Sequence, residues 1–373
     1  MTMPPSPREA RQARGAARIG ALVPLTRPGW VEAGRHLLAG LELAVHDANI
    51  AGGIAGRPLE LLVRDTAADP QRAAAAVDEW ADLGVAALAG EYHSVVARAA
   101  AARADALGLP FLCASAVLDA LTGQPTEWVA RLAPPQSRGW GIYADFLLGK
   151  GHRRIAVAAE PSVYWASGTR ILRDCLEPRS GAVIDLDARS LAPAAMCDAL
   201  IDHRADALLL LLGFPEPAVS IVKAVRGDPR LAGLLVGAPA GQPEFDGWMA
   251  SLGDDGAAIP FLRYLPGRLT PLGARVDADL RKRLSAAPSF VAFEGYDTIV
   301  VLADMLRSHG MERPRMAGAW PRVAVEGTRG TIGFSRVPGV SVWQWAAAPV
   351  QVVDRDPAEP ARFRVLHADG EGA

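Results

Sequence analysis

Short apolar runs alternate with longer amphipathic segments along this chain of 373 residues. The first apolar run spans 19–25, and the segment 32–49 after it repeats leucine, alanine and valine at helical spacing. A second run at 58–65 is followed by Asp69-Pro70, which is a typical helix start. This alternation of strand and helix predicts a parallel sheet with helices on both faces.

The third junction between strand and helix carries a group of polar residues. The apolar run 85–89 predicts a buried strand, and the alanine-rich segment 97–107 predicts the next helix. Tyr92, His93 and Ser94 lie between them. Ser94 falls at the helix start, where a hydroxyl either caps unpaired N–H groups or helps them hold an anion or carbonyl oxygen. Because ligands collect at the carboxyl ends of parallel strands, Ser94 is a candidate ligand anchor, with a plain helix cap as the alternative.

A break in the pattern at 133–137 is followed by a second series of strands and helices. A further strand, turn and helix are expected at 110–121 before the break. The wholly apolar run 207–212 is typical of a strand covered on both faces. The other expected strands span 154–159, 182–186 and 234–237, with a short hairpin formed by 327–334 and 342–345. The expected helices span 140–148, 168–176, 193–203, 217–225, 271–284 and 293–306.

Composition and charge narrow the class of protein. A chain of this length exceeds the usual size of one core, so two domains are expected. The net charge of −2 gives no support to nucleic-acid binding. Cys113, Cys175 and Cys197 form no metal-binding or redox pattern, so neither a metal nor a cofactor is expected. Cys113 ends a strand and fits a core position better than a reactive one.

No catalytic signature stands out in the sequence. The glycine-rich stretch 51–56 follows a helix rather than opening one, so it predicts a turn and not a phosphate-binding loop. Neither a GxSxG elbow nor an HExxH motif occurs. The chain is therefore expected not to be an enzyme.

The proline- and arginine-rich segment 1–17 predicts a flexible lead-in without the apolar core of a signal peptide. No stretch is long and apolar enough for membrane insertion. As the sequence stands, these features favour a cytoplasmic location. A start codon further upstream would instead allow a periplasmic or extracellular one.

One run of residues carries a family resemblance. The pattern NxxGGIxGRPLELxxxD at 49–65, with Asp69-Pro70 after it, resembles the type I periplasmic binding proteins. The nearest branch is the leucine/isoleucine/valine-binding family of ABC-transporter solute receptors. GLPF at 108–111, GYD at 295–297 and GTIGF at 330–334 extend the likeness, which covers about 19–353.

The resemblance implies an α/β fold of two doubly wound, Rossmann-like parallel-sheet lobes. A three-strand hinge joins the lobes, which close on a ligand in the cleft. The crossovers would lie near 133–137, 257–263 and 328–334. The implied division is 1–17 as a lead-in, 18–133 plus 264–328 as lobe one, 134–263 plus 329–357 as lobe two, and 358–373 as a flexible tail.

The resemblance also implies a ligand site. The family holds a carboxylate or amide with a serine at the position of Ser94, and Tyr92 and His93 share that loop. His93 as a solvated loop residue is the alternative. The loop after the next strand would contribute Ser115 and Ala116, while the family's usual threonine is replaced here by Val117.

Aromatic side chains would complete that site. Tyr164 and Trp165 are expected in a polar loop of lobe two, and Phe214 at a second aromatic position. Tyr296, at the start of its helix, could reach the cleft, and Trp30 could cover its mouth. Core packing is the alternative for Tyr164, Trp165 and Phe214, and a partly exposed loop position is the alternative for Trp30.

Amino-acid binders of this family pair the ligand's ammonium with an acid where this chain reads GAPAG at 237–241. A buried ammonium without a counter-charge is costly, so an amide or an amine-free carboxylate fits better, unless Glu216 or Glu294 supplies the charge. The expected partner is a small organic ligand, together with an ABC permease or, in a cytosolic sensor, a regulatory protein. Catalysis on the solute is a third alternative, and the apolar helices are compatible with a homodimer.

Overall fold

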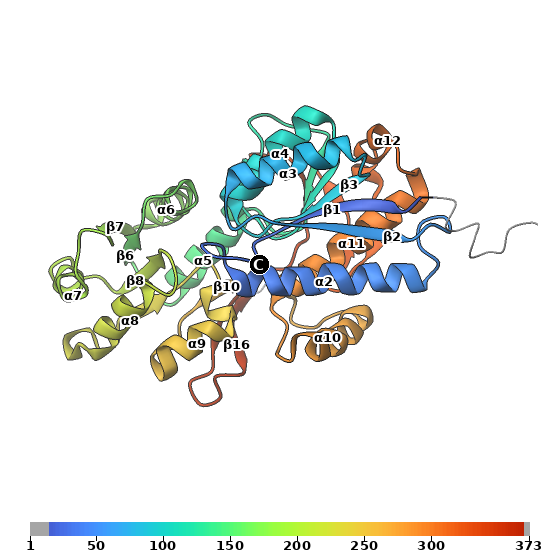
Figure 1. Ribbon diagram of the computed structural model, residues 1–373. Coiled ribbons are helices and arrows are strands. Elements are labelled where there is room, and N and C mark those ends of the chain that lie inside the picture. Colours follow the sequence, from blue (N-terminus) through green and yellow to red (C-terminus); the bar gives the residue numbers. More distant parts are fainter. Residues whose placement is uncertain (1–14, 369–373) are drawn as a thin grey trace, which may run out of the picture. The chain divides into compact units, whose positions relative to one another are not determined.

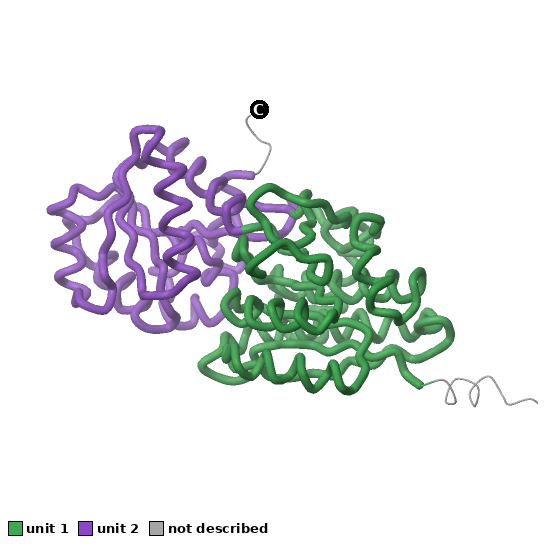
Figure 2. Tube along the Cα trace, turned by 90° about the horizontal axis from the view of Figure 1, so that it is seen from above, with its two compact units in different colours: residues 1–135, 268–348 green, residues 136–267, 349–373 purple. Residues whose placement is uncertain are grey.

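The computed structural model describes residues 15–368, and the chain divides into two compact units (Figures 1 and 2). Unit 1 consists of Met1–Pro135 and Arg268–Ala348. Unit 2 consists of Gln136–Gly267 and Pro349–Ala373. The chain thus passes between the units three times, as expected for this fold, but the last passage follows Ala348 instead of lying near 328–334.

Unit 1 is built on a seven-stranded sheet in the order β2-β1-β3-β4-β5-β14-β13. All neighbours pair in parallel except β13, which is antiparallel to β14 and forms part of the expected hairpin. The strands are β1 (Ala17–Val23), β2 (Leu59–Asp65), β3 (Ala87–Gly90), β4 (Phe111–Cys113), β5 (Val129–Arg131), β13 (Phe334–Ser335) and β14 (Trp343–Trp345), with β11 (Val325–Glu326) and β12 (Thr331–Ile332) forming a separate pair.

Two pairs of helices cover this sheet (Figure 1). Helices α2 and α11 pack against each other, as do α3 and α4. The helices of unit 1 are α2 (Val31–Ile50), α3 (Pro70–Asp82), α4 (Ser94–Leu107), α10 (Pro271–Leu284), α11 (Phe290–His309) and α12 (Arg313–Ala317). The start of α3 is as predicted, because the Asp69 carboxylate accepts hydrogen bonds from the N–H groups of Gln71 and Arg72.

The family-like run between α2 and β2 folds as a closed turn. The Asn49 side chain accepts a hydrogen bond from the Leu59 N–H at 2.7 Å and donates one to the Leu59 carbonyl at 2.9 Å. Gly53 has a φ of +73°, and a Cβ there would collide with the Arg57 carbonyl oxygen. The turn therefore needs both the asparagine amide and a glycine, which explains this part of the sequence pattern.

Unit 2 contains a four-stranded parallel sheet in the order β7-β6-β8-β9 and a three-stranded antiparallel sheet in the order β10-β15-β16. Its strands are β6 (Arg154–Ala159), β7 (Ala182–Asp187), β8 (Ala207–Leu211), β9 (Leu235–Gly237), β10 (Phe261–Arg263), β15 (Gln351–Arg355) and β16 (Phe363–Ala368). Its helices are α5 (Gln136–Gly149), α6 (Val163–Leu176), α7 (Pro193–Asp202), α8 (Ala218–Gly227) and α9 (Asp246–Leu252).

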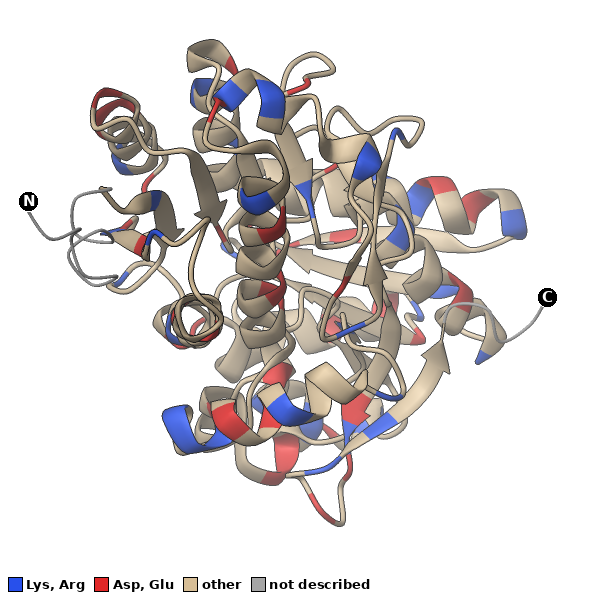
Figure 3. Cartoon of the chain, turned by 90° about the vertical axis from the view of Figure 1, so that its right-hand side faces the viewer, with Lys and Arg blue, Asp and Glu red and all other residues tan. Residues whose placement is uncertain are grey.

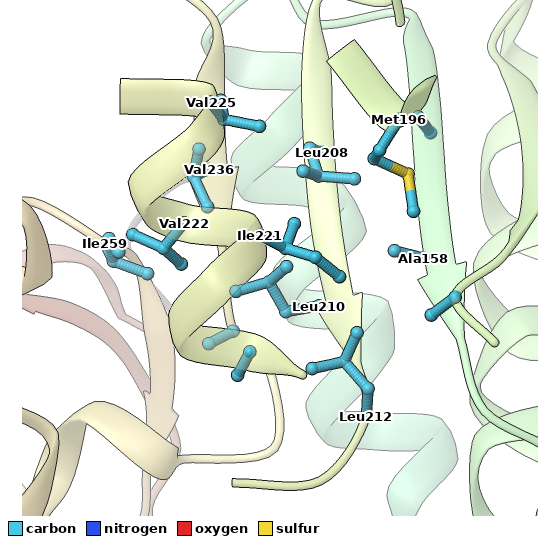
Figure 4. Close-up of a cluster of buried hydrophobic side chains, with 14 of the residues drawn as sticks. Ala158, Met196, Leu208, Leu210, Leu212, Ile221, Val222, Val225, Val236 and Ile259 are labelled. Carbon is cyan, nitrogen blue, oxygen red and sulfur yellow. The ribbon is translucent and has the colours of Figure 1, made fainter. Parts of the chain in front are cut away.

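Strand β8 crosses the core of unit 2 and is buried along its whole length, as its apolar run predicts. Leu208 and Leu210 belong to a cluster that also includes Ile221 and Val222 of α8 and Met196 of α7 (Figure 4). Apolar contact on both faces of the sheet removes this strand from water, which is the main source of its stability.

Two expectations about the chain differ from the structure. No helix follows β4 at 114–121, and the unexpected strand β5 comes next. Within the expected tail, 363–368 forms β16, paired with β15 and anchored by Phe363, whose ring lies 5.8 Å from that of Phe261. The lead-in at 1–14 and the last residues, 369–373, lie outside the described residues.

Acidic and basic residues are interspersed over the helices (Figure 3). Within residues 15–368, no helix combines the length and the apolar character that a membrane crossing requires.

Candidate functional site

The loop between β3 and α4 is organised by Glu91, a buried acid that the sequence analysis did not single out. Its carboxylate accepts hydrogen bonds from the N–H groups of Tyr92 at 2.8 Å and His93 at 3.0 Å, and from the Thr66 hydroxyl at 2.7 Å. Burial raises the pKa of Glu91. The one available signal is its place directly after a fully buried apolar strand.

Ser94 is the first residue of α4, and His93 occupies the capping position before it. The Ser94 hydroxyl oxygen accepts hydrogen bonds from the N–H groups of Val117 at 3.1 Å and Leu118 at 3.4 Å. The reading of Ser94 as a plain helix cap is therefore wrong. Its hydroxyl joins the start of α4 to the loop that follows β4.

Arg131, at the end of β5, holds the same loop from another side. Its guanidinium donates to the Leu118 carbonyl at 2.5 Å and to the Gln344 side-chain oxygen at 2.7 Å. The Gln344 amide in turn donates to the Ala133 carbonyl at 2.8 Å. This buried network fixes the loop after β4 without any helix.

Ser115 and Ala116 lie in that loop, and both are buried. The Ser115 hydroxyl is hydrogen-bonded to the Glu294 carboxylate, which also forms an ion pair with Arg329 at 3.3 Å. Both the Ser115 hydroxyl and the Glu294 carboxylate therefore already have partners within unit 1. Beside them, burial raises the pKa of the Cys113 thiol to about 12, as expected for an unreactive core cysteine.

Trp30, Tyr92 and His93 come together at the carboxyl ends of β1 and β3. The Trp30 backbone N–H donates to His93 Nε2 at 3.0 Å. The Tyr92 ring lies edge-on to both neighbours, with centroid separations of 6.4 Å to Trp30 and 5.2 Å to His93. All three side chains are half-buried, so His93 is a structural part of the loop and not a solvated residue.

His93 gives this loop a pH dependence. Burial lowers its pKa from 6.5 to about 4, so its ring is neutral at pH 7. The His93 ring of the unfolded chain takes up a proton at a higher pH than that of the folded chain. The contribution of the neutral His93 to stability is therefore fully present above pH 6.5 and is lost as the pH falls towards 4. We expect His93→Gln, whose amide can still accept from Trp30, to flatten this decline. Parallel thermal unfolding of the two proteins between pH 7.5 and 4 checks it, and identical pH profiles would contradict it.

In unit 2, Tyr164 and Trp165 lie in the first turn of α6 and not in a loop. Helix α6 begins earlier than expected because the Ser162 hydroxyl accepts from the Trp165 N–H at 3.0 Å. The rings of Tyr164 and Trp165 are 4.6 Å apart, and Trp140 lies 6.1 Å from Tyr164. The two predicted aromatics form one half-buried group at the carboxyl end of β6.

Phe214 follows β8, half-buried, with its ring 5.5 Å from that of Trp248. It packs against the core cluster of unit 2. The nearby Glu216 is exposed and accepts from the Ser220 N–H at 3.3 Å, so it serves the start of α8.

Tyr296 does not join these groups. Its hydroxyl donates to Asp47 at 2.8 Å and accepts from Arg275 at 2.8 Å, and its side chain is buried between α2 and α10. Helix α11 begins at Phe290, so Tyr296 is a turn further along than expected. Asp47 lies near the end of α2, away from the strand ends that carry Ser94, and this placement corrects the expectation that Tyr296 reaches a ligand.

Among residues 15–368, no three His, Cys, Asp or Glu side chains are grouped so as to hold a metal ion. The loops at the carboxyl ends of these strands carry hydroxyl, imidazole and backbone N–H groups, together with the buried Glu91 carboxylate. In an open α/β sheet this edge is where small molecules bind.

The chain forms two α/β units and passes from one to the other three times, which is the architecture of the two-lobed binding proteins. The family model described as "Periplasmic binding protein" matches residues 16–351, and the chain belongs to this family. The match covers both units.

Solved structures share the fold at low sequence identity. The leucine binding protein LivK from Thermotoga maritima aligns with a TM-score of 0.80 and 18% identity, over 95% of this chain and 98% of that one. A solute binding protein from R. palustris in complex with benzoate aligns with a TM-score of 0.78 and 16% identity, over 95% of this chain and 96% of that one.

A curated relative, the Leu/Ile/Val-binding protein homolog 8 of Brucella abortus, is 33% identical over 160 residues. The matched segment covers 40% of this chain and 39% of the relative. The chain therefore matches about two fifths of the curated relative's length.

Proposed function

We propose that this protein is a receptor for a small organic solute, of the type that serves ABC transporters and closes its lobes on the ligand. The solute is an amide, a carboxylate or an amino-acid-like molecule, and the protein partner is an ABC permease. Membership of the binding-protein family over 16–351 supports this role, as do fold relatives that bind leucine or benzoate.

The observation that carries the proposal is the hydroxyl of Ser94. Ser94 is 9% exposed and stands at the carboxyl edge of the sheet, and its hydroxyl ties two loops together through Val117 and Leu118. The half-buried rings of Trp30 and Tyr92 lie in the same region of unit 1 and offer apolar surface beside this polar anchor.

A thermal-shift screen tests the proposal with amides, aliphatic and aromatic carboxylates and amino acids. A ligand that binds only the folded protein at about 100 times its Kd stabilises it by about 2.7 kcal/mol. We expect at least one class of compound to raise the Tm and to be recovered unchanged after long incubation. A flat screen would contradict the receptor role, and a converted compound would indicate an enzyme.

Ser94→Ala is expected to weaken the binding of a compound found in that screen by about 1–3 kcal/mol, because one hydrogen bond to its polar end is lost. Calorimetry measures the effect. Ser251→Ala is the matched control, since that hydroxyl only donates to the Gly247 carbonyl within α9. Unchanged affinity in Ser94→Ala would mean that this serine serves only to join the two loops.

A further inference from the structure

Strand β2 forms one edge of the seven-stranded sheet of unit 1, where it pairs with β1 alone. The Thr66 N–H, just beyond β2, donates to the Val23 carbonyl of β1, so the backbone groups at even positions of β2 face β1. The backbone groups at odd positions therefore point away from the sheet. An edge of this kind is a template on which another strand can pair.

One end of this edge is closed by the protein itself, but its middle is open. The Asn49 amide bonds both backbone groups of Leu59. The Arg64 guanidinium donates to the Val63 carbonyl at 3.1 Å. Within residues 15–368, no partner is found for the N–H and C=O of Leu61 or for the N–H of Val63.

The sequence of β2 is complementary to itself when a second copy runs antiparallel to it. With Leu62 opposite its own copy, Leu61 of one chain faces Val63 of the other. These are outward-pointing residues, so their N–H and C=O groups can bond one another. The same register places Glu60 opposite Arg64 of the second copy, and opposite charges at facing positions stabilise an antiparallel pair.

The two charged side chains of β2 can change partners at little cost. Glu60 pairs with Arg18 at 2.9 Å and Arg64 pairs with Glu79, and the four side chains are between 44% and 47% exposed. Exposed ion pairs of this kind contribute little to stability. Turning the Arg64 side chain towards a second copy also releases the Val63 carbonyl for backbone pairing.

The other edge strands of similar length lack this complementarity. In the described part of the chain they are β7 and β16, each of six residues. Strand β7 carries Asp185 and Asp187 but no basic residue, and β16 carries Arg364 and His367 but no acid. Neither strand can therefore place opposite charges across its own copy, and like charges directly opposite are destabilising.

We propose that two copies of this chain associate by antiparallel pairing of their β2 strands, with Leu62 on the two-fold axis. The interface is isologous, since the same residues serve on both sides. It holds about four backbone hydrogen bonds between Leu61 and Val63 of the two copies, and a Glu60–Arg64 ion pair on each side of the axis. This association goes beyond the receptor function and does not depend on it.

Sedimentation equilibrium of the full chain over a concentration series tests the proposal. We expect a monomer–dimer equilibrium that Val63→Pro weakens about tenfold or more, because proline removes one outward N–H from each copy and leaves the bonds to β1 intact. A chain that stays monomeric at millimolar concentration would overturn the proposal.

Val183→Pro is the matched control for the proline variant. The Ala182 N–H donates to the Arg153 carbonyl beside β6, so the next N–H along β7, that of Val183, also points outward from an edge. We expect this variant to dimerise as the wild type does. Equal weakening by Val63→Pro and Val183→Pro would contradict the assignment of the interface to β2.

Charge reversal gives a second test that does not depend on proline. Glu60→Arg or Arg64→Glu alone places like charges opposite each other and should weaken the dimer. The double variant restores opposite charges in reverse order, so it should dimerise more tightly than either single variant. A double variant that associates no more tightly than the single ones would overturn the proposed register.

Discussion

Replacing Arg329 with methionine is expected to lower the free energy of unfolding by about 3–5 kcal/mol. The guanidinium is fully buried, lies 2.9 Å from the Asp297 carboxylate and 3.3 Å from that of Glu294, and stacks 5.0 Å from the Trp345 ring. Methionine fills much of the same volume but leaves two carboxylates buried without their cation. Breaking a buried pair in this way costs far more than the pair itself contributes.

Urea denaturation measures this loss, and Arg315→Met provides the control. Arg315 pairs with Glu312 at 2.8 Å, but the two side chains are 68% and 66% exposed, and exposed pairs contribute about 0–1 kcal/mol. Equal losses in the two variants would contradict the assigned role of Arg329.

The pH dependence of the Arg329 variant gives an independent check. Burial already raises the pKa of Asp297, and loss of the neighbouring cation removes the main opposing influence. The folded variant should then take up protons at a higher pH than its unfolded chain does. Its stability relative to the wild type should therefore recover as the pH falls from 7 towards 5.

The apolar pattern of the sequence was enough to predict much of the fold. Strand β6 spans the expected 154–159 and helix α10 the expected 271–284, while β8 ends one position before the expected 207–212. In each of these elements the pattern of apolar residues lies within the element itself. Strand β8 is wholly apolar and covered on both faces, and α10 is capped by Thr270. The family resemblance added what periodicity does not contain, namely the discontinuous units.

The missed elements depend on partners far away in the chain. Strand β5 is only three residues long, and it pairs with β14, which comes from the second half of the sequence. Strand β16 is too polar to resemble a core strand, yet Arg263 and Arg355 stack on its Phe363 at 4.3 and 4.9 Å. No local window of the sequence holds these contacts.

The candidate site likewise combines a feature that the local sequence predicts with contacts that it does not. Helix-start chemistry placed Ser94 correctly, but its partners Val117 and Leu118 are 23 and 24 residues away. Glu91 and Arg131 were overlooked because a buried charge can only be explained once its partners are known. The groups of the site that remain free to bind a ligand therefore depend on hydrogen bonds between distant parts of the chain, which the sequence alone does not show.

Helices α2 and α11 offer the second large effect, because Gly40→Ala is expected to destabilise the protein by about 3 kcal/mol or more. A Cβ on Gly40 would lie 2.8 Å from the Tyr296 backbone nitrogen and would overlap the Ala292 carbonyl oxygen. Gly295 approaches the Leu37 carbonyl from the opposite helix in the same manner. Both obstacles are backbone atoms, so no side chain can rotate away, and the two helices would have to separate.

The matched control, Gly141→Ala, is expected to change the stability in the opposite direction. Gly141 lies within α5, and a Cβ there would meet only the Cys175 sulfur, at 4.0 Å. With no collision, Gly141→Ala should stabilise the protein by about 0.5–1 kcal/mol through helix propensity alone. The Tm values and urea midpoints of the two variants should therefore move in opposite directions. A stabilising Gly40→Ala would mean that α2 and α11 do not pack as closely as these glycines permit.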